Sequence, residues 1–178
     1  MSPVINDYLP MARGLPREQF LARHPEPVLL QRSSPDSLAP REEYGNTQKM
    51  RIDPATRELR VEQPLPSPLE AVVPVAKAER NSFASQVLVG RTDSNDLVVA
   101  HLTVSKHHAF FRLDEATGRH TLTDMDSTNG TRVNGQSLQG RQAQELADGD
   151  LVAFGDMRFV FYTAGGFYDL LCSLSALR

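Results

Sequence analysis

The sequence has few of the residues that build disulfide frameworks, metal clusters or membrane spans. Its 178 residues include one cysteine, Cys172, and no tryptophan. A single cysteine excludes an internal disulfide and a paired CxxC metal cluster, and it suits a reducing compartment. No uninterrupted apolar run approaches the roughly 18 residues of a membrane-spanning helix, and the first residues lack the basic start and apolar run of a secretion signal. We therefore expect a cytoplasmic protein that does not bind a membrane.

An excess of positive charge is also missing. Nineteen Lys and Arg residues against 22 Asp and Glu residues give a net charge of -3 at pH 7. Such a chain has no global field that attracts nucleic acid or anionic lipid, so any anion site must be local. Hydrophobic residues make up 40% of the chain, which is enough for the core of one ordinary domain with additional segments.

Prolines interrupt the first 70 residues, which we interpret as an N-terminal extension in which any helix is short. Pro16 followed by residues 17–23 is typical of a helix of about two turns, because proline suits the first helical position. The composition further indicates a strand at residues 28–31, a loop at 32–44, a hairpin within 50–62 and a proline-rich linker at 64–68.

From residue 71 the composition changes to short β-rich runs separated by turn residues. Apolar and polar residues alternate within these runs, as in strands that bury one face, and Asn-Gly or Asp-Gly pairs lie between several of them. Eight short strands at this spacing predict a mainly β fold, an antiparallel β-sandwich over residues 71–162. The predicted strands are residues 71–77, 86–90, 96–99, 107–113, 120–124, 131–134, 151–155 and 157–162.

The spacing of apolar residues changes again in residues 163–178, where it predicts an amphipathic C-terminal helix. The apolar stripe consists of Phe167, Leu170, Leu171, Leu174 and Leu177. Because such a stripe is unfavourable in water, we expect this helix to pack on the sandwich or on the N-terminal helix rather than to bind a partner.

Four short motifs in the loops between predicted strands carry the candidate chemistry. An arginine presents forked donors that match phosphate oxygens, and a phosphothreonine carries about -1.5 to -2 charges at neutral pH. Together with hydroxyl side chains on neighbouring loops, this set favours a binder of phosphorylated threonine over an enzyme. The motifs are Gly90-Arg91, Ser94-Asn95-Asp96, Val104-Ser105-Lys106-His107-His108-Ala109, and Ser127-Thr128-Asn129-Gly130-Thr131 with Val133-Asn134-Gly135.

In this order the motifs resemble those of the forkhead-associated (FHA) domain, a β-sandwich that binds phosphothreonine peptides with loops at one end. FHA domains are among the modules that recognise phosphate through arginine. The resemblance covers residues 71–162, and the flanks are similar to bacterial FHA proteins. It implies that three residues hold the phosphate and that Asn129 orients the peptide backbone. Lys106, which follows Ser105, is a candidate for an additional mobile positive charge. The three residues are Arg91, Ser105 and Thr128.

The chemistry of these side chains agrees with the implied roles. The hydroxyl and the backbone N–H of Ser105 can both donate to a phosphate oxygen, as can the Thr128 hydroxyl, and the Asn129 amide can pair with an extended peptide. Each also has an ordinary alternative. Arg91 alone would be a surface arginine beside Asp93, Ser105 a turn serine, Lys106 a solvated lysine, and Asn129-Gly130 a hairpin turn without a ligand.

Four further residues are expected to support the binding loops. Gly90 precedes the phosphate arginine at a strand end, and Gly130 relaxes the turn after Asn129. The resemblance implies that His108 is a scaffold residue that holds the loops by hydrogen bonds. Asn134 either helps to hold the loops or belongs only to its own Asn-Gly turn.

We expect no catalytic or metal site. His107 and His108 follow one another in a strand and point to opposite faces, so they cannot easily bind one ion together. Ser105 has histidine and aspartate residues near it but no Gly-x-Ser-x-Gly elbow, and the chain has no phosphate-binding P-loop. The sequence thus predicts neither an enzyme activity nor a cofactor.

The resemblance implies a phosphothreonine-containing partner protein, such as a Ser/Thr protein kinase or its substrate, and a role in signal transduction. No nucleic acid partner is expected. Two alternatives stay open. One is a phosphate-independent scaffold that uses the sandwich and its flanking helices. The other is phosphate-dependent self-association through one of the chain's own threonines.

Overall fold

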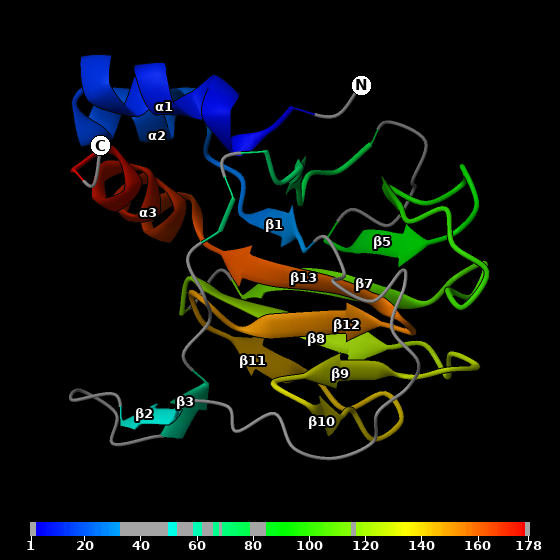
Figure 1. Ribbon diagram of the computed structural model, residues 1–178. Coiled ribbons are helices and arrows are strands. Elements are labelled where there is room, and N and C mark those ends of the chain that lie inside the picture. The colour runs from blue at the N-terminus through cyan, green and yellow to red at the C-terminus, as the bar shows by residue number, and fades with distance from the viewer. Residues whose placement is uncertain are drawn as a thin grey trace.

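The computed structural model describes residues 3–32, 50–52, 59–61, 66–67, 69–78, 85–114 and 117–176. Within these ranges the chain forms helices at both ends and strands between them (Figure 1). The helices are α1 (Ile5–Gly14), α2 (Arg17–Arg23) and α3 (Ala164–Ala176). The strands are β1 (Val28–Gln31), β2 (Met50–Ile52), β3 (Leu59–Val61), β4 (Val72–Pro74), β5 (Val87–Gly90), β6 (Leu97–Val98), β7 (Ala109–Asp114), β8 (Arg119–Asp124), β9 (Thr131–Val133), β10 (Gln136–Ser137), β11 (Gln144–Leu146), β12 (Leu151–Phe154) and β13 (Met157–Tyr162).

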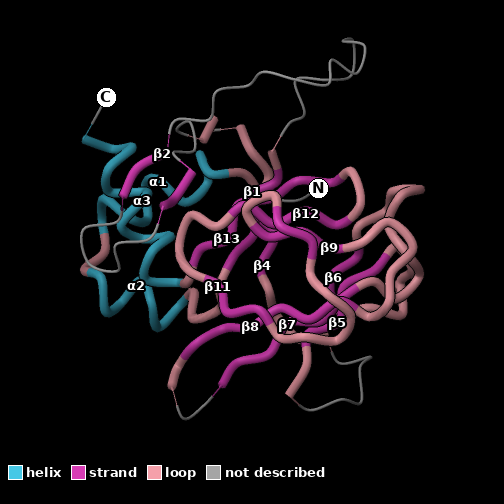
Figure 2. The backbone as a smooth tube through the Cα atoms, turned by 90° about the horizontal axis from the view of Figure 1, so that it is seen from below, coloured by secondary structure: helices cyan, strands magenta, loops and turns pink. Residues whose placement is uncertain are grey.

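Two sheets face one another, which confirms the predicted β-sandwich with helices at its N- and C-terminal ends. One sheet has six strands in the order β10-β9-β12-β13-β1-β4, and the other has five in the order β11-β8-β7-β5-β6. Figure 2 shows the strands of the two layers side by side, with the helices grouped beside them. All strand pairs in these two sheets are antiparallel except β5 with β6, which is parallel.

Strand β1 comes from the predicted N-terminal extension and is part of the six-stranded sheet. It pairs with β13 on one side and with β4 on the other. The predicted hairpin within residues 50–62 forms as a separate pair, β2 with β3. All but the first residue of the predicted loop at 32–44 and most of the predicted linker at 64–68 lie outside the described residues.

The two faces of the six-stranded sheet pack against different partners, because successive side chains of a strand point to opposite faces. Leu29 and Phe161 lie in the core between the two sheets, together with Phe111 of β7. Leu30 and Val160 face the other way and pack against the helices in a second apolar cluster. The molecule therefore has three layers, with the six-stranded sheet between the helices and the five-stranded sheet.

Helix α1 is longer than the prolines suggested. It runs through Pro10, which cannot donate to the carbonyl of Asn6. Asn6 and Pro10 are both exposed, so that side of the helix is open to water. The buried residues Ile5, Tyr8 and Leu9 anchor the opposite side in the second cluster, which stabilises the helix despite the proline.

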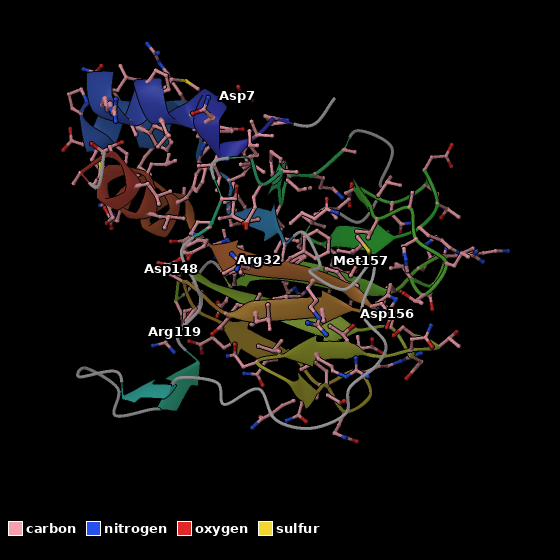
Figure 3. All side chains as sticks on the ribbon, viewed as in Figure 1. Asp7, Arg32, Arg119, Asp148, Asp156 and Met157 are labelled. Atoms are coloured by element: carbon pink, nitrogen blue, oxygen red, sulfur yellow. The ribbon has the colours of Figure 1, made fainter. Side chains whose placement is uncertain are left out.

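The C-terminal helix docks against an aspartate of the sandwich. Asp148 accepts hydrogen bonds from the backbone N–H and the hydroxyl of Thr163, just before α3 begins, and lies at the same side of the molecule as the helices (Figure 3). A Cβ on Gly166 would overlap the Asp148 carboxylate, so this approach needs glycine. Phe167 and Leu171 of α3 are buried against α1 and α2, as the apolar stripe predicted, whereas Leu177 lies outside the described residues.

Of the helices in the described part of the chain, none has the length and apolar character that spanning a bilayer requires. Within the same residues, His, Cys, Asp and Glu side chains do not gather in groups of three or more that would hold a metal ion.

Candidate functional site

Three loops meet at one end of the sandwich. Residues 91–96 follow β5, residues 99–108 precede β7, and residues 125–130 connect β8 to β9. In Figure 1 these loops lie at the end of the sandwich opposite the helices. Every motif singled out from the sequence has residues in them except Asn134-Gly135.

Arg91 is the first residue after β5, and its side chain is exposed. Its backbone N–H donates a hydrogen bond of 3.0 Å to the carbonyl oxygen of Ser105, which joins the first loop to the second. Among the described residues, no ion pair or hydrogen bond involves the Arg91 guanidinium, including any with Asp93. The forked donors of this arginine thus face water.

Asn95 joins the same two loops from within, and its side chain is only 3% exposed. Its Nδ2 donates to the carbonyl oxygen of Lys106 at 2.7 Å and to that of Thr92 at 2.9 Å, while its Oδ1 lies 3.1 Å from Nδ1 of His107. The motif Ser94-Asn95-Asp96 was singled out from the sequence, but no role was predicted for Asn95 itself. Its role in holding the loops depends on long-range contacts that the local sequence does not show.

Gly90 is required by the close approach of these loops. A Cβ at this position would overlap the carbonyl oxygen of Lys106 and would lie 2.6 Å from Nδ2 of Asn95. Only glycine leaves room for both groups. The Lys106 side chain is exposed, and it makes no hydrogen bond or ion pair among the described residues.

The second and third loops meet through two hydroxyl side chains. The backbone N–H of Thr128 donates to Oγ of Ser105 at 3.0 Å, and the Ser105 hydroxyl lies 3.4 Å from Oγ1 of Thr128. The two hydroxyl groups are therefore side by side, close to the backbone contact between Ser105 and Arg91. An anion placed here would meet two hydroxyl donors beside the backbone junction that carries Arg91.

His108 holds the second and third loops from below. Its ring is completely buried, and it packs edge-on against Phe154 with 5.6 Å between the ring centroids. Nδ1 accepts a hydrogen bond of 3.0 Å from the backbone N–H of Ser105, so the ring proton is on Nε2, which donates to the carbonyl oxygen of Gly130 at 3.2 Å. The Ser105 N–H is consequently engaged by the scaffold.

Burial lowers the pKa of His108, although the hydrogen bond to Gly130 and the nearby charge of Asp124 act in the opposite direction. The neutral ring is the form that fits the observed bonds, because a protonated Nδ1 could not accept from Ser105.

Asp124, at the end of β8, fixes the shape of the third loop. Its Oδ1 accepts hydrogen bonds of 2.6 Å from the hydroxyls of Ser127 and Thr131, and its Oδ2 accepts from the backbone N–H of Ser127. Burial alone would raise the pKa of Asp124, but these hydrogen bonds outweigh burial and lower it. Asp124 is a site residue that the sequence pattern did not indicate.

Asn129 and Gly130 form the tip of the third loop. Gly130 has a φ of 75°, a backbone conformation that favours glycine. Nδ2 of Asn129 donates a hydrogen bond of 2.8 Å to the carbonyl oxygen of Thr103, which connects the tip to the second loop. Asn129 is exposed, and within the described residues its Oδ1 has no hydrogen-bond partner, so this oxygen is available as an acceptor.

Asn134 lies at the opposite end of β9 from Gly130. Its amide donates to Asp150 at 2.9 Å and accepts from the backbone N–H of Leu151 at 2.9 Å. These bonds join the β9–β10 turn to β12, so the structure does not bring Asn134 to the three loops.

The three loops lie within the segment of the chain that matches a known protein family. The family model of the FHA domain matches residues 87–155, which include β5 through β12 and all three loops. The oxoglutarate dehydrogenase inhibitor of Corynebacterium glutamicum is 39% identical over 72 residues, which cover 40% of this chain and 47% of that protein. The glycogen accumulation regulator GarA of Mycolicibacterium smegmatis is 39% identical over 74 residues, which cover 42% of this chain and 44% of that one.

The chain thus spans about half the length of the curated relatives it matches first. Among solved structures, EmbR of Mycobacterium tuberculosis in complex with a low-affinity phosphopeptide aligns with a TM-score of 0.43 and 19% identity. That alignment covers 78% of this chain and 24% of the EmbR chain.

Proposed function

This chain contains a forkhead-associated domain, and from that premise we propose that it docks phosphothreonine-containing partner proteins through Arg91, Ser105 and Thr128. Asn129 orients the bound peptide, and Lys106 adds a positive charge at the rim. In this role the protein acts by reversible binding rather than by catalysis.

The observation that carries the proposal is the backbone hydrogen bond between Arg91, whose side chain is exposed, and Ser105, whose hydroxyl is paired with that of Thr128. An exposed arginine without a partner is common and would not by itself indicate a site. The backbone N–H of Arg91, however, is hydrogen-bonded to Ser105, and Oγ of Ser105 in turn accepts from the backbone N–H of Thr128. A dianionic phosphate would accept from all three side chains, and such charge-assisted bonds are stronger than neutral ones. The Ser105–Thr128 contact would open or rearrange to admit it.

The scaffold around these residues holds the binding loops in a rigid, preformed shape. His108, Asn95 and Asp124 are buried and hydrogen-bonded from several directions, so the loops need little ordering when a ligand binds. Low ordering cost allows a small number of contacts to give useful affinity.

The names of the relatives are consistent with a regulatory role. One is an inhibitor of a dehydrogenase and another a regulator of glycogen accumulation. For this chain we propose a place in cytoplasmic signalling in which a Ser/Thr protein kinase supplies the phosphate, the partner being that kinase or its substrate.

The test measures binding of a degenerate phosphothreonine peptide library and of the same library without phosphate. Both are measured by fluorescence polarisation at physiological salt. We expect binding only of the phosphorylated library and a loss of at least about tenfold in Arg91→Ala, because a charge-assisted bond contributes roughly 1.5 to 3 kcal/mol. Arg112→Ala, which removes an exposed arginine of β7, is the matched control and should bind like the parent. Equal binding of both libraries would instead favour the phosphate-independent scaffold.

A further inference from the structure

Leu102 is the most exposed of the large apolar side chains in the described residues, at 90% of its full accessible surface. It lies at the corner of a tight turn that is closed by a hydrogen bond of 3.1 Å from the backbone N–H of Val104 to the carbonyl oxygen of His101. Corner positions of such turns accept most residue types, and polar ones are common there. Folding therefore does not require a leucine at this position.

The turn that carries Leu102 is held firmly by its other residues. The Thr103 hydroxyl accepts from the backbone N–H of Asp156 at 3.0 Å and lies 2.8 Å from Nδ1 of His101. Gly155 packs so closely on Thr103 that a Cβ there would lie 2.7 Å from Oγ1 of Thr103. Leu102 consequently projects from a fixed backbone, so a contact with it would cost little backbone entropy.

This turn is directly connected to the proposed phosphopeptide site. The carbonyl oxygen of Thr103 accepts the hydrogen bond from Nδ2 of Asn129, the residue expected to orient the peptide. Ser105 follows only two residues after Thr103. Because an extended peptide advances about 3.3 Å per residue, a side chain a few positions from the phosphothreonine would reach Leu102.

We propose that Leu102 contacts an apolar side chain of the docked phosphopeptide and so selects partners that carry a Val, Ile, Leu, Met or Phe within a few residues of the phosphothreonine. The inference rests on the proposed function and deepens it. Lone exposed leucines are common on proteins, but this one adjoins the loop that holds the peptide-orienting residue on a fixed turn.

An acidic residue whose backbone is hydrogen-bonded to the same turn sharpens the expected preference. Asp156 follows Gly155 in the turn between β12 and β13, is exposed, and lies at the loop end of the sandwich (Figure 3). Its carboxylate would repel an acidic peptide side chain that approached Leu102. At the selected position we therefore expect apolar residues to be preferred and Asp or Glu to be the least favoured.

The experiment compares position-oriented phosphothreonine libraries, varied at each of four positions on either side of the phosphothreonine, on the parent chain, Leu102→Ala and Leu102→Arg. The parent should prefer apolar residues at one position. Leu102→Ala should lose about five- to tenfold in affinity for the preferred peptide. This is the loss expected when about 50 Å² less apolar surface is buried on binding. Leu102→Arg should weaken the apolar preference and reduce the penalty for acidic residues.

The matched control is Leu113→Ala. Leu113 is 48% exposed and lies on β7 opposite His120, next to the pair Asp114–Arg119 at the end of the sandwich away from the loops (Figure 3). It should leave both the affinity and the preference unchanged. Both leucines are exposed, so neither change should unfold the chain.

The outcomes separate this inference from the function on which it rests. Phosphate-dependent binding with the same residue preference in the parent and in Leu102→Ala would overturn the role of Leu102 and leave the proposed function standing. An absence of phosphate-dependent binding by the parent would overturn both. A preference lost in Leu102→Ala, with phosphate dependence kept and Leu113→Ala normal, would establish the contact.

Discussion

The backbone N–H of Ser105 donates to Nδ1 of His108, and the opposite nitrogen of the same ring donates to the carbonyl oxygen of Gly130. One neutral imidazole thus joins the loop of a proposed phosphate ligand to the loop that carries Thr128 and Asn129. Adding a proton to Nδ1 would break the first of these bonds and place a positive charge in the core.

Acid should therefore destabilise the fold through His108. Its pKa is lowered by burial, so the unfolded chain binds a proton more readily than the folded chain once the pH falls below the unfolded value of about 6.5. The stability that the neutral ring provides is present above that pH and is lost as the pH falls through the folded-state pKa. We expect the free energy of unfolding, measured by urea titration, to decrease from pH 7 to pH 5.

His120 contributes in the same direction, because burial lowers its pKa as well. Asp124 adds nothing in this window, since its stabilising ionised form is lost only below an unfolded value of about 3.9. Single His108→Gln and His120→Gln variants separate the two histidines. If His108→Gln kept the full pH dependence of the parent, the role assigned to the His108 ring would be wrong.

Asn95→Asp should weaken both the fold and phosphopeptide binding. The substitution keeps the size of the side chain but replaces the two donors of Nδ2 with an acceptor that faces the carbonyl oxygens of Lys106 and Thr92. Loss of a buried donor with its partners left in place costs roughly 1 to 3 kcal/mol. The cost would be measured by urea unfolding, with affinity for a phosphothreonine peptide measured in parallel.

Asn6→Asp is the control for Asn95→Asp, because Asn6 is exposed on α1 and has the same chemistry. It should change stability by less than about 0.5 kcal/mol. Equal effects of the two substitutions would show that Asn95 does not hold the loops.

Asn95 also illustrates what the sequence could predict and what it could not. The strand pattern from residue 71 predicted the sandwich because alternation and turn pairs are local signals, and the helical stripe at Phe167 predicted α3 for the same reason. Strands β10 and β11 were missed because both are short and largely polar, so neither shows an apolar alternation.

At the site, the order of motifs predicted which loops meet but not how they are joined. Asn95 holds the loops by donating to the backbone of Lys106 in another loop, and Asp124 does so by accepting from the buried hydroxyl of Thr131. Neither residue has a distinctive local sequence. Asn134 was grouped with the loops because its Asn-Gly pair closes the motif, yet its bonds run to Asp150 and Leu151. Its predicted support of the loops stays a prediction.

Gly90→Ala should disrupt the junction of the first two loops. The added methyl group would overlap a backbone oxygen, that of Lys106, and a backbone atom cannot move aside as a flexible side chain can. Overpacking of this kind costs about 1 to 3 kcal/mol, and the displaced loop should also lower phosphopeptide affinity by several-fold. Urea unfolding and fluorescence polarisation would measure the two effects.

Gly14→Ala provides the comparison for Gly90→Ala. Gly14 is the last residue of α1, and a Cβ there would meet no atom within 4 Å. Its replacement should be neutral or stabilise by up to about 1 kcal/mol, because alanine reduces the freedom of the unfolded chain. A Gly90→Ala variant as stable and as active as the parent would contradict the contact described at the loops.

Phe167→Ala should loosen the helical layer without altering the peptide site. The Phe167 ring is buried in the cluster shared by the helices and packs edge-on against Tyr8, with 5.3 Å between the ring centroids. Removing a buried phenylalanine costs about 3 to 5 kcal/mol. The core between the two sheets, which holds Phe111 and Phe154, is a separate cluster and should keep its packing.

Hydrogen exchange resolved by residue would measure this effect. Amide protection should fall in α1 and α3 of Phe167→Ala but persist in β7 and β8, while affinity for a phosphothreonine peptide should stay within about twofold of the parent. Ser173→Ala changes an exposed residue of the same helix and should leave protection unchanged. Phe167→Leu serves as a milder variant if the alanine form does not fold. A large loss of affinity in the leucine form would mean that the helical layer and the loops are coupled, and the two ends of the molecule could not then be treated as independent.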